Sequence, residues 1–238
     1  MRMRKKPNLP ERIAKCGDLY IQDPARFRDG WQQQFPQFRD KHLEIGCGRG
    51  RFTTETALKM PDILLIAVER VPEAMIIGLE RATREQIPNV RFLDTDAATL
   101  PGIFGDGEVG RIYINFCDPW PKAGNRKRRL THENFLIIYQ SILRVGGEIH
   151  FKTDNRDLFE FSLGQFEEAG FELSEVTTNL HQNGPVGIMT DYEEKFYNVG
   201  VSICRCVAKL SEKAHRFGER AGAPDIRGSD IEKRREQE

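Results

Sequence analysis

The middle of the chain alternates short apolar segments with amphipathic ones, and this alternation limits the possible folds more than any other feature. Strands are predicted at 41–46, 64–69, 89–93, 111–116, 147–152, 171–176 and 195–210. Helices are predicted at 52–59, 72–86, 131–145 and 156–169. Strands and helices that alternate in this way form a doubly wound, mostly parallel, Rossmann-like α/β sheet. The last two strands follow one another without a helix, so we expect seven strands with the last one antiparallel.

The sequence divides into three parts. We expect a basic N-terminal segment at 1–30, one α/β domain at 31–210, and a charged tail at 211–238 that has little to bury and is either disordered or a mobile helix. No segment approaches the roughly 20 apolar residues that a membrane-spanning helix needs, so a cytoplasmic protein without a membrane partner is expected. The five cysteines form no CxxC pair, and neither they nor the five histidines have the spacing of metal ligands.

The first predicted strand ends in a glycine-rich loop that begins with an acid. From Glu44 the chain reads Glu-Ile-Gly-Cys-Gly-Arg-Gly-Arg, with Gly46 and Gly48 at the turn into the next helix. Glu69 ends the following strand about 20 residues later, and this combination indicates a nucleoside whose ribose hydroxyls bind a carboxylate. NAD and S-adenosylmethionine (SAM) both contain such a nucleoside. The large Arg51 obstructs a pyrophosphate, whereas acids attract the cationic groups of SAM, so the pattern resembles class I SAM methyltransferases.

Two further strand ends carry acids. Asp96 follows the third strand, where methyltransferases use an acid to bind the adenine amino group, although aspartate also caps helices well. The fourth strand leads into Asp118-Pro-Trp-Pro-Lys122, in which Trp120 offers a planar face to a base or cofactor. A rigid turn around a buried tryptophan is the structural alternative. The formal net charge is zero, so the case for nucleic acid depends on a local basic run that consists of Lys122, Arg126, Lys127, Arg128 and Arg129.

These motifs together resemble the tRNA (guanine-N7-)-methyltransferase family. The resemblance extends from Met1 to about Leu210, and includes the opening Met-Arg-Met-Arg-x-Lys-Pro, the run His-Phe-Lys-Thr-Asp-Asn that ends at Asn155, and Thr-Asp-Tyr-Glu-Glu-Lys-Phe from Thr190. The chain departs from the family at Gly124-Asn125, where Arg-His is usual. This change removes a cation and a ring from the basic loop.

The resemblance implies roles for particular residues. Cofactor contacts are implied for the glycine loop at Gly46 and Gly48 and for Glu44, Glu69, Asp96 and Asp118. Asp118 is implied to be catalytic. Substrate contacts are implied for Lys122, Asp154, Thr190, Tyr192 and Glu193.

The implied reaction needs few catalytic groups. Guanine N7 has a free lone pair at neutral pH, so no general base is required. Methylation places positive charge on the purine, and Asp118 and Asp154 are the candidates for offsetting it. Cys117 is a candidate nucleophile only for a pyrimidine substrate, so packing is its expected role. Two alternatives stay open: an amino-group methyltransferase that acts on another base or a protein, and an RNA-binding module without activity. With tRNA as its partner, we expect a monomer or homodimer.

Overall fold

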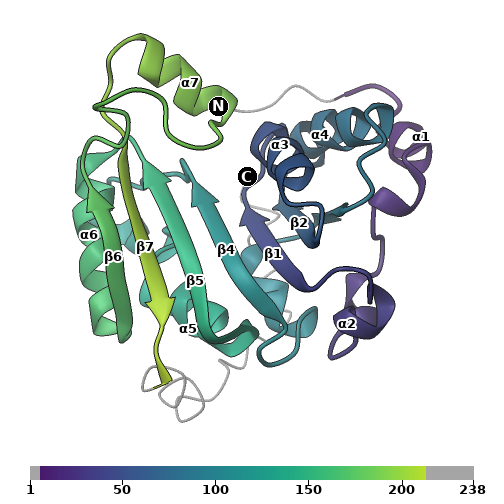
Figure 1. Ribbon diagram of the computed structural model, residues 1–238, viewed down its shortest axis with the longest axis horizontal. Coiled ribbons are helices and arrows are strands. Elements are labelled where there is room, and N and C mark those ends of the chain that lie inside the picture. The colour runs from purple at the N-terminus through teal and green to yellow at the C-terminus, as the bar shows by residue number, and fades with distance from the viewer. Residues whose placement is uncertain (1–5, 213–238) are drawn as a thin grey trace.

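The computed structural model describes residues 6–212 and contains one seven-stranded sheet with the order β3-β2-β1-β4-β5-β7-β6 (Figure 1). The first five strands pair in parallel, and β7 is antiparallel to both β5 and β6. The predicted doubly wound α/β fold with an antiparallel last strand is therefore confirmed. The strands are β1 (Asp40–Ile45), β2 (Ile63–Glu69), β3 (Val90–Asp94), β4 (Val109–Asn115), β5 (Leu143–Thr153), β6 (Phe171–Thr177) and β7 (Cys204–Leu210).

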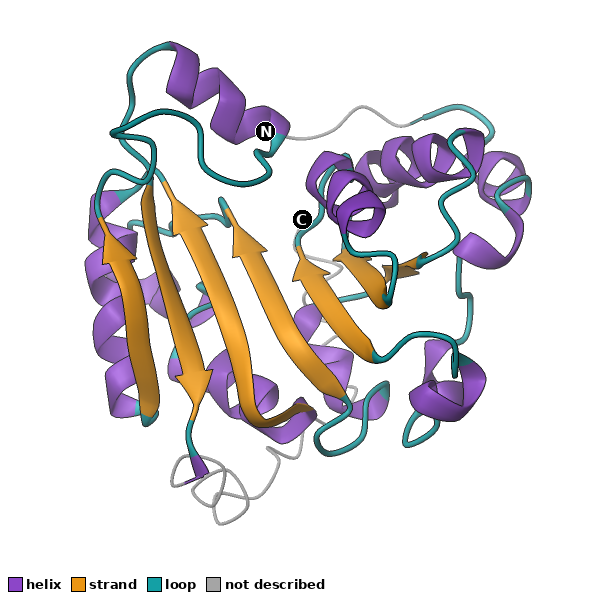
Figure 2. Cartoon of the chain, viewed as in Figure 1, coloured by secondary structure: helices purple, strands orange, loops and turns teal. Residues whose placement is uncertain are grey.

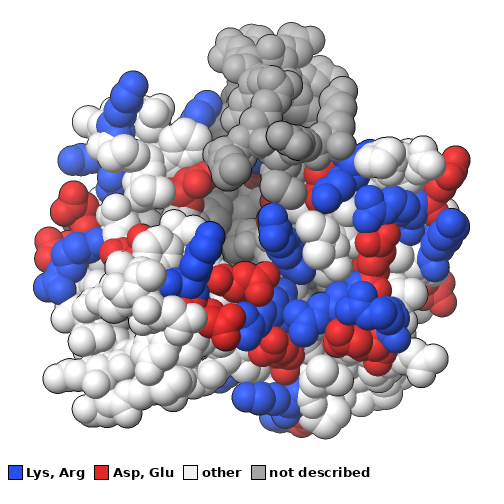
Figure 3. Space-filling view, turned by 90° about the horizontal axis from the view of Figure 1, so that it is seen from above, with Lys and Arg blue, Asp and Glu red and all other residues white. Residues whose placement is uncertain are grey.

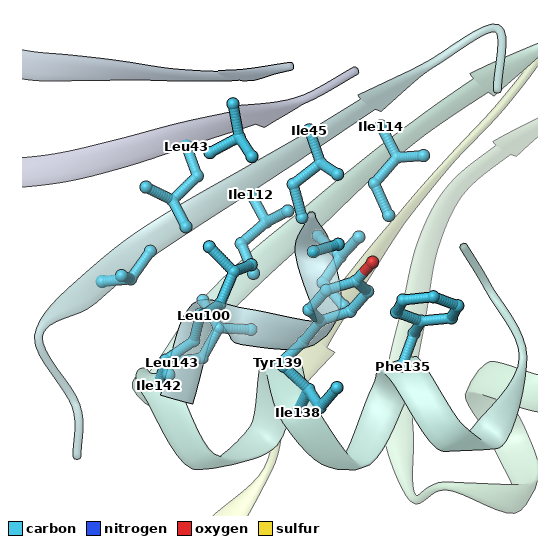
Figure 4. Close-up of a cluster of buried hydrophobic side chains, with 14 of the residues drawn as sticks. Leu43, Ile45, Leu100, Ile112, Ile114, Phe135, Ile138, Tyr139, Ile142 and Leu143 are labelled. Carbon is cyan, nitrogen blue, oxygen red and sulfur yellow. The ribbon is translucent and has the colours of Figure 1, made fainter. Parts of the chain in front are cut away.

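Helices cover the two faces of this sheet (Figure 2). On β2, Leu64, Ile66 and Val68 belong to the apolar cluster that includes side chains of α5 and α6, whereas Leu65 and Ala67 pack with α3 and α4. Alternate residues of a strand point to opposite faces, which explains why buried strands read as continuous apolar runs. Figure 4 shows α5 packed against β1 and β4. The α-helices are α1 (Leu9–Ala14), α2 (Trp31–Gln34), α3 (Arg51–Lys59), α4 (Pro72–Arg84), α5 (Glu133–Ile142), α6 (Arg156–Glu168) and α7 (Asp191–Asn198).

The described part of the segment assigned to 1–30 packs against the α/β unit. Helix α1 lies beside α4, where the Arg12 guanidinium donates to both carboxylate oxygens of Glu80 at 2.6 and 2.7 Å. Phe27, in the same segment, packs against the fully buried Trp31 of the α/β unit, with ring centroids 5.3 Å apart. Most of the predicted tail, at 213–238, lies outside the described residues. Within the described residues, no helix has the length and apolar character needed to cross a membrane.

The strand predicted at 195–210 is wrong in its first half. Residues 191–198 form helix α7, and only 204–210 form a strand. A capping box opens the helix: Glu193 N donates to Thr190 Oγ1 at 2.9 Å, and Thr190 N donates to the Glu193 carboxylate at 3.3 Å. These bonds satisfy backbone donors in the first turn, so the helix forms despite the aromatic residues that favour a strand.

The helix predicted at 131–145 is also shorter than expected. It ends at Ile142, because Leu143 has extended backbone angles (φ −75°, ψ 134°) and pairs with Val109 of β4. Strand β5 therefore begins before Gly146-Gly147 and includes both glycines.

The glycine loop approaches α4 so closely that no side chain fits between them. Gly50, which precedes α3, has φ +72°, and a Cβ added there would lie 2.7 Å from the Cα of Gly78. A Cβ on Gly78 would lie 2.8 Å from the Cα of Gly50 and 3.0 Å from the carbonyl oxygen of Arg49. Gly78 therefore allows the loop to lie directly on α4.

Gly78→Ala is expected to lower the free energy of unfolding by about 1–3 kcal/mol, because the loop backbone must move. Gly164→Ala is the matched control, since Gly164 also lies inside a helix but an added Cβ there meets nothing within 4 Å. This control should stabilise the protein by up to about 1 kcal/mol through helix propensity. Urea unfolding measures both changes, and equal effects of the two substitutions would contradict the close packing of the loop on α4.

One carboxyl group lies inside the sheet. Glu44 of β1 is 1% exposed, accepts a hydrogen bond from the hydroxyl of Thr53, and accepts another from Asn115 Nδ2 at 3.1 Å. Burial raises the pKa of Glu44 to about 7, against the opposing effect of these two hydrogen bonds. The folded protein therefore binds the proton of Glu44 more tightly than the unfolded chain does.

Because this pKa is raised, the stability that Glu44 contributes is present below pH 4.5 and is lost as the pH rises towards 7. Relative to Glu44→Gln, the wild type should lose up to about 3 kcal/mol of unfolding free energy across this range. Urea titrations at several pH values measure the difference. Glu167→Gln, a change at an exposed carboxyl, should leave the profile unchanged. A flat difference between the wild type and Glu44→Gln would refute the raised pKa.

Candidate active site

A cavity of about 300 Å³ opens at the carboxyl ends of the central strands. It lies at the position where β1 and β4 are neighbours, from which the strand order runs outward in both directions. Open α/β sheets bind ligands at such a switch point. The residues predicted for cofactor binding that line the cavity are Gly46, Glu69, Asp96 and Asp118.

Glu69 joins two loops at this edge. Its Oε2 accepts a hydrogen bond from Gly48 N at 2.9 Å, and its Oε1 accepts one from Val71 N at 2.9 Å. Gly46 and Gly48 both have positive φ, at +77° and +55°, which permits the turn that presents Gly48 N to the carboxylate. The carboxylate is thereby fixed on the wall of the cavity, and each oxygen retains a lone pair for a ligand hydroxyl.

Asp96 serves as a helix cap and also lines the cavity. Its Oδ1 accepts a hydrogen bond from Ala98 N at 2.9 Å at the start of the 3₁₀ helix η3 (Ala97–Gly102). The capping and ligand-binding interpretations are therefore compatible, because the cap uses one oxygen and fixes the other.

Glu44 does not line the cavity. Its nearly complete burial places it behind the cavity wall, where it accepts a hydrogen bond from the lining residue Asn115. Asn115 is 7% exposed, and its Oδ1 has no hydrogen-bond partner within the described part of the chain. A second cavity, of about 350 Å³, is also lined by Asn115, so this residue separates the two.

The loop after β4 has an unusual backbone. Phe116 and Trp120 have φ of +54° and +40°, which are costly for aromatic residues and tend to occur at functional sites. Trp120 is half-buried and lines the cavity, so it is not only a core residue. Asp118 lies between them and is exposed, and within residues 6–212 it has no hydrogen bond or ion pair. Its carboxylate is therefore available to a ligand.

Two cations of the basic run stabilise this loop. Arg129 is 6% exposed and donates to the carbonyl oxygens of Pro119 and Trp120 at 2.9 and 3.2 Å. The Arg128 guanidinium lies 4.8 Å from the ring centroid of Trp120. The structure thus places Arg129 inside the loop rather than on a surface open to phosphate, because its donors satisfy backbone carbonyls.

The other cations of the run are exposed, on or beside the 3₁₀ helix η4 (Ala123–Arg128). They are Lys122, Arg126 and Lys127. Gly124-Asn125 lies within η4, between Lys122 and Arg126. Figure 3, which looks onto this edge of the sheet, shows groups of Lys and Arg side chains with Asp and Glu between them.

Helix α7 brings further predicted residues to the same edge (Figure 1). The Tyr192 ring lies 5.5 Å from that of Phe116, which lines the cavity. Burial, and then the charge of Asp154, raises the pKa of the Tyr192 phenol. Tyr192 therefore lies near both Asp154 and the strained loop. Glu193, in contrast, is 0% exposed and pairs with Lys152 and His181.

Cys117 lines the cavity, but its chemistry does not favour catalysis. Burial raises the pKa of its thiol to about 12. The thiolate is the nucleophilic form, so a thiol that stays protonated at neutral pH is a poor nucleophile.

Sequence reasoning missed four residues of this region. Phe116 and Asn115 precede Asp118, and nothing in the sequence indicated that their side chains line the cavity. Lys152 lies inside the predicted motif that ends at Asn155, on β5 two residues before Asp154, and a lysine in a buried strand was the available clue. His181 had none, because its partner Glu193 is distant in sequence.

Comparisons with known proteins agree with this geometry. A family model described as "Putative methyltransferase" matches residues 39–206. The tRNA (guanine-N(7)-)-methyltransferase of Geobacillus thermodenitrificans is 44% identical over 209 residues, which cover 87% of this chain and 97% of that protein. The protein of the same name from Macrococcus caseolyticus is 47% identical over 211 residues, covering 88% and 100%.

Solved structures share the fold at lower identity. The 16S rRNA methyltransferase KamB aligns with a TM-score of 0.60 and 17% identity, covering 77% of this chain and 93% of that one. A mutant 16S rRNA (adenine(1408)-N(1))-methyltransferase from Catenulisporales acidiphilia, solved with the cosubstrate SAM, gives 0.59 and 14%, covering 81% and 93%. The fold, the cavity at its switch point and the extent of identity to the curated relatives lead to one conclusion: the chain is a SAM-dependent methyltransferase and belongs to the tRNA (guanine-N(7)-)-methyltransferase family.

Proposed function

We propose that this protein methylates N7 of a guanine in the variable loop of tRNA, with Asp118 and Asp154 as its catalytic carboxylates. One observation carries the proposal. The unpaired carboxylate of Asp118 lines the same cavity as Glu69 and Asp96, and exposed cations begin only four residues later, at Lys122. A site for the methyl donor and a surface for RNA are therefore continuous.

The cavity residues fit the donor. Its volume lies at the lower end of the range for ligand pockets, about 300–1,000 Å³. Glu69 is held by two backbone donors and suits the ribose hydroxyls, while Asp96 and Ala97 suit the adenine. When bound, SAM supplies an electrophilic methyl group. The protein residues bind and orient both reactants, and this alignment supplies much of the rate enhancement.

The acids near the mouth of the cavity suit a reaction that creates positive charge. Guanine N7 needs no proton removed, so Asp118 need not act as a base. A carboxylate beside the purine can accept hydrogen bonds from its Watson–Crick edge and offset the charge that develops during methyl transfer. Tyr192, near Asp154 and Phe116, offers a ring on which the base can stack.

The target base must leave its stack before it reaches these residues. The major groove of A-form RNA is too deep and narrow for side chains, so an accessible loop nucleotide is the expected substrate. Phosphate contacts from the exposed cations would offset the cost of extruding the base. Such an enzyme works where tRNA occurs, which we expect to be the cytoplasm. Action as a monomer or homodimer stays a prediction.

Asp118→Asn should reduce methyl transfer to tRNA roughly 100-fold or more, because the charge that stabilises the transition state is lost. Transfer is measured with labelled SAM, and digestion of the tRNA to nucleosides identifies the product. Asp23→Asn, at an exposed aspartate that does not line the cavity, should retain full activity. If the wild type gives a methylated amino group instead of 7-methylguanosine, the proposed acceptor is wrong.

Simultaneous replacement of Lys122, Arg126 and Lys127 by glutamine should weaken tRNA binding at every sequence. The plot of log affinity against log salt should flatten by roughly 2, at about 0.7 for each single-strand phosphate that the variant no longer binds. Lys209→Gln, on β7 near the start of β6, is the control and should leave the slope unchanged. An unchanged slope in the triple variant would show that this loop does not bind phosphate.

A further inference from the structure

A buried charge cluster lies beneath α7, outside the cavity assigned to the donor. At its centre, Glu193 is 0% exposed. Its Oε2 accepts a hydrogen bond from Lys152 Nζ at 2.5 Å, and its Oε1 lies 3.0 Å from Nε2 of His181. Lys152 is on β5, Glu193 is in the first turn of α7, and His181 is in the loop between β6 and α7.

The same cluster fixes the loop that residues 178–190 form between β6 and α7. His181 Nδ1 accepts a hydrogen bond from Val186 N at 3.1 Å, so the other ring nitrogen must carry the proton that is donated to Glu193. Lys152 Nζ also donates to the carbonyl oxygen of Ile188 at 3.2 Å. Val186 and Ile188 form part of the wall of the second cavity. Strand, loop and helix are thus connected through one carboxylate.

Glu193 is not accessible to tRNA. One of its oxygens binds His181, and the other binds Lys152 and the backbone N–H of Thr190. Neither oxygen reaches the surface, because the residue is fully buried. Its sequence neighbour Glu194, by contrast, is exposed and pairs with Arg51 at 2.5 Å.

The cluster fixes the position of α7 relative to the reaction site. Tyr192 precedes Glu193 in the first turn, and its ring contacts both Phe116 and Phe196, with centroids 5.5 and 4.5 Å apart. Phe116 leads directly into Cys117 and Asp118 and lines the donor cavity. A shift of the first turn of α7 would therefore move Tyr192 away from the wall beside Asp118.

We propose that Glu193 is a positioning residue which, through Lys152 and His181, fixes α7 and the preceding loop over the reaction site without contacting tRNA. The inference rests on the proposed function, because it assigns Tyr192 and Asp154 to the substrate side. Lys152 and His181 are then positioning residues as well. Removing one partner of a buried ion pair leaves an uncompensated charge, whereas neutralising both partners removes that penalty.

The test compares Lys152→Met, Glu193→Gln and the double variant with the wild type. Hydrogen exchange is measured over residues 179–198, together with kcat and KM for tRNA. Each single change should speed exchange in this segment roughly 100-fold or more, since local opening becomes easier. Each should also lower kcat/KM roughly 10- to 100-fold by misplacing the substrate side of the site. The double variant should be no worse than the more affected single variant.

Glu194→Gln is the matched control, the same chemical change one residue further along α7. It removes only an exposed ion pair and should alter exchange and kinetics little. If Glu193→Gln raises KM without changing exchange, or if its effect adds in full to that of Lys152→Met, Glu193 contacts tRNA directly and the proposal fails.

The proposed function and the positioning role fail in different ways. If the wild type forms no 7-methylguanosine, the proposed function is wrong, whatever the exchange data show. If the wild type forms it and the single variants exchange like the wild type, only the positioning role is wrong. If a single variant does not fold, the double variant is compared with the wild type instead. Both residues of the pair are then neutral, so the double variant should fold.

Discussion

The parallel pairing of β1 with both β2 and β4 is the constraint on which the site depends. This pairing brings the carboxyl ends of the three strands to one edge, so Gly46, Glu69 and Asn115 become neighbours although they are far apart in sequence. The Glu69 carboxylate then connects two of these ends by binding Gly48 N and Val71 N. The close contact of Gly50 with Gly78 holds the loop on α4. Without this register the acids would not share a cavity.

The fold and most of the cofactor side could be predicted because their signals are local. Each strand ends in a turn that the sequence marks with glycine or an acid, and topology alone brings these ends together. The placement of Glu69, Asp96 and Asp118 on one cavity follows from that rule. Glu44 was harder to assign, because the same alternation that puts it on β1 also buries it under Asn115 and Thr53.

The structure of the substrate side of the site could not be predicted in the same way, because its contacts are between residues distant in sequence. The second half of helix α7 was predicted as the start of a strand, since aromatic residues favour strands, and the ion pair between Glu193 and Lys152 cannot be recognised in the sequence. Arg129 looked like its basic neighbours, but its guanidinium satisfies two backbone carbonyls of the loop after β4. A charge run therefore combines residues that face solvent with residues that hold the loop, and the sequence does not separate them.

The carboxylates around the cavity differ in environment, and the environments separate their roles. Burial raises the pKa of Glu44 to about 7, so at neutral pH it is a poor source of fixed negative charge. Both oxygens of Glu69 accept backbone hydrogen bonds, which makes it a positioned acceptor on the donor side. Glu193 is neutralised by Lys152. Asp118 alone of these four is both exposed and without a partner among residues 6–212, so its charge remains available to a purine that becomes cationic as it is methylated.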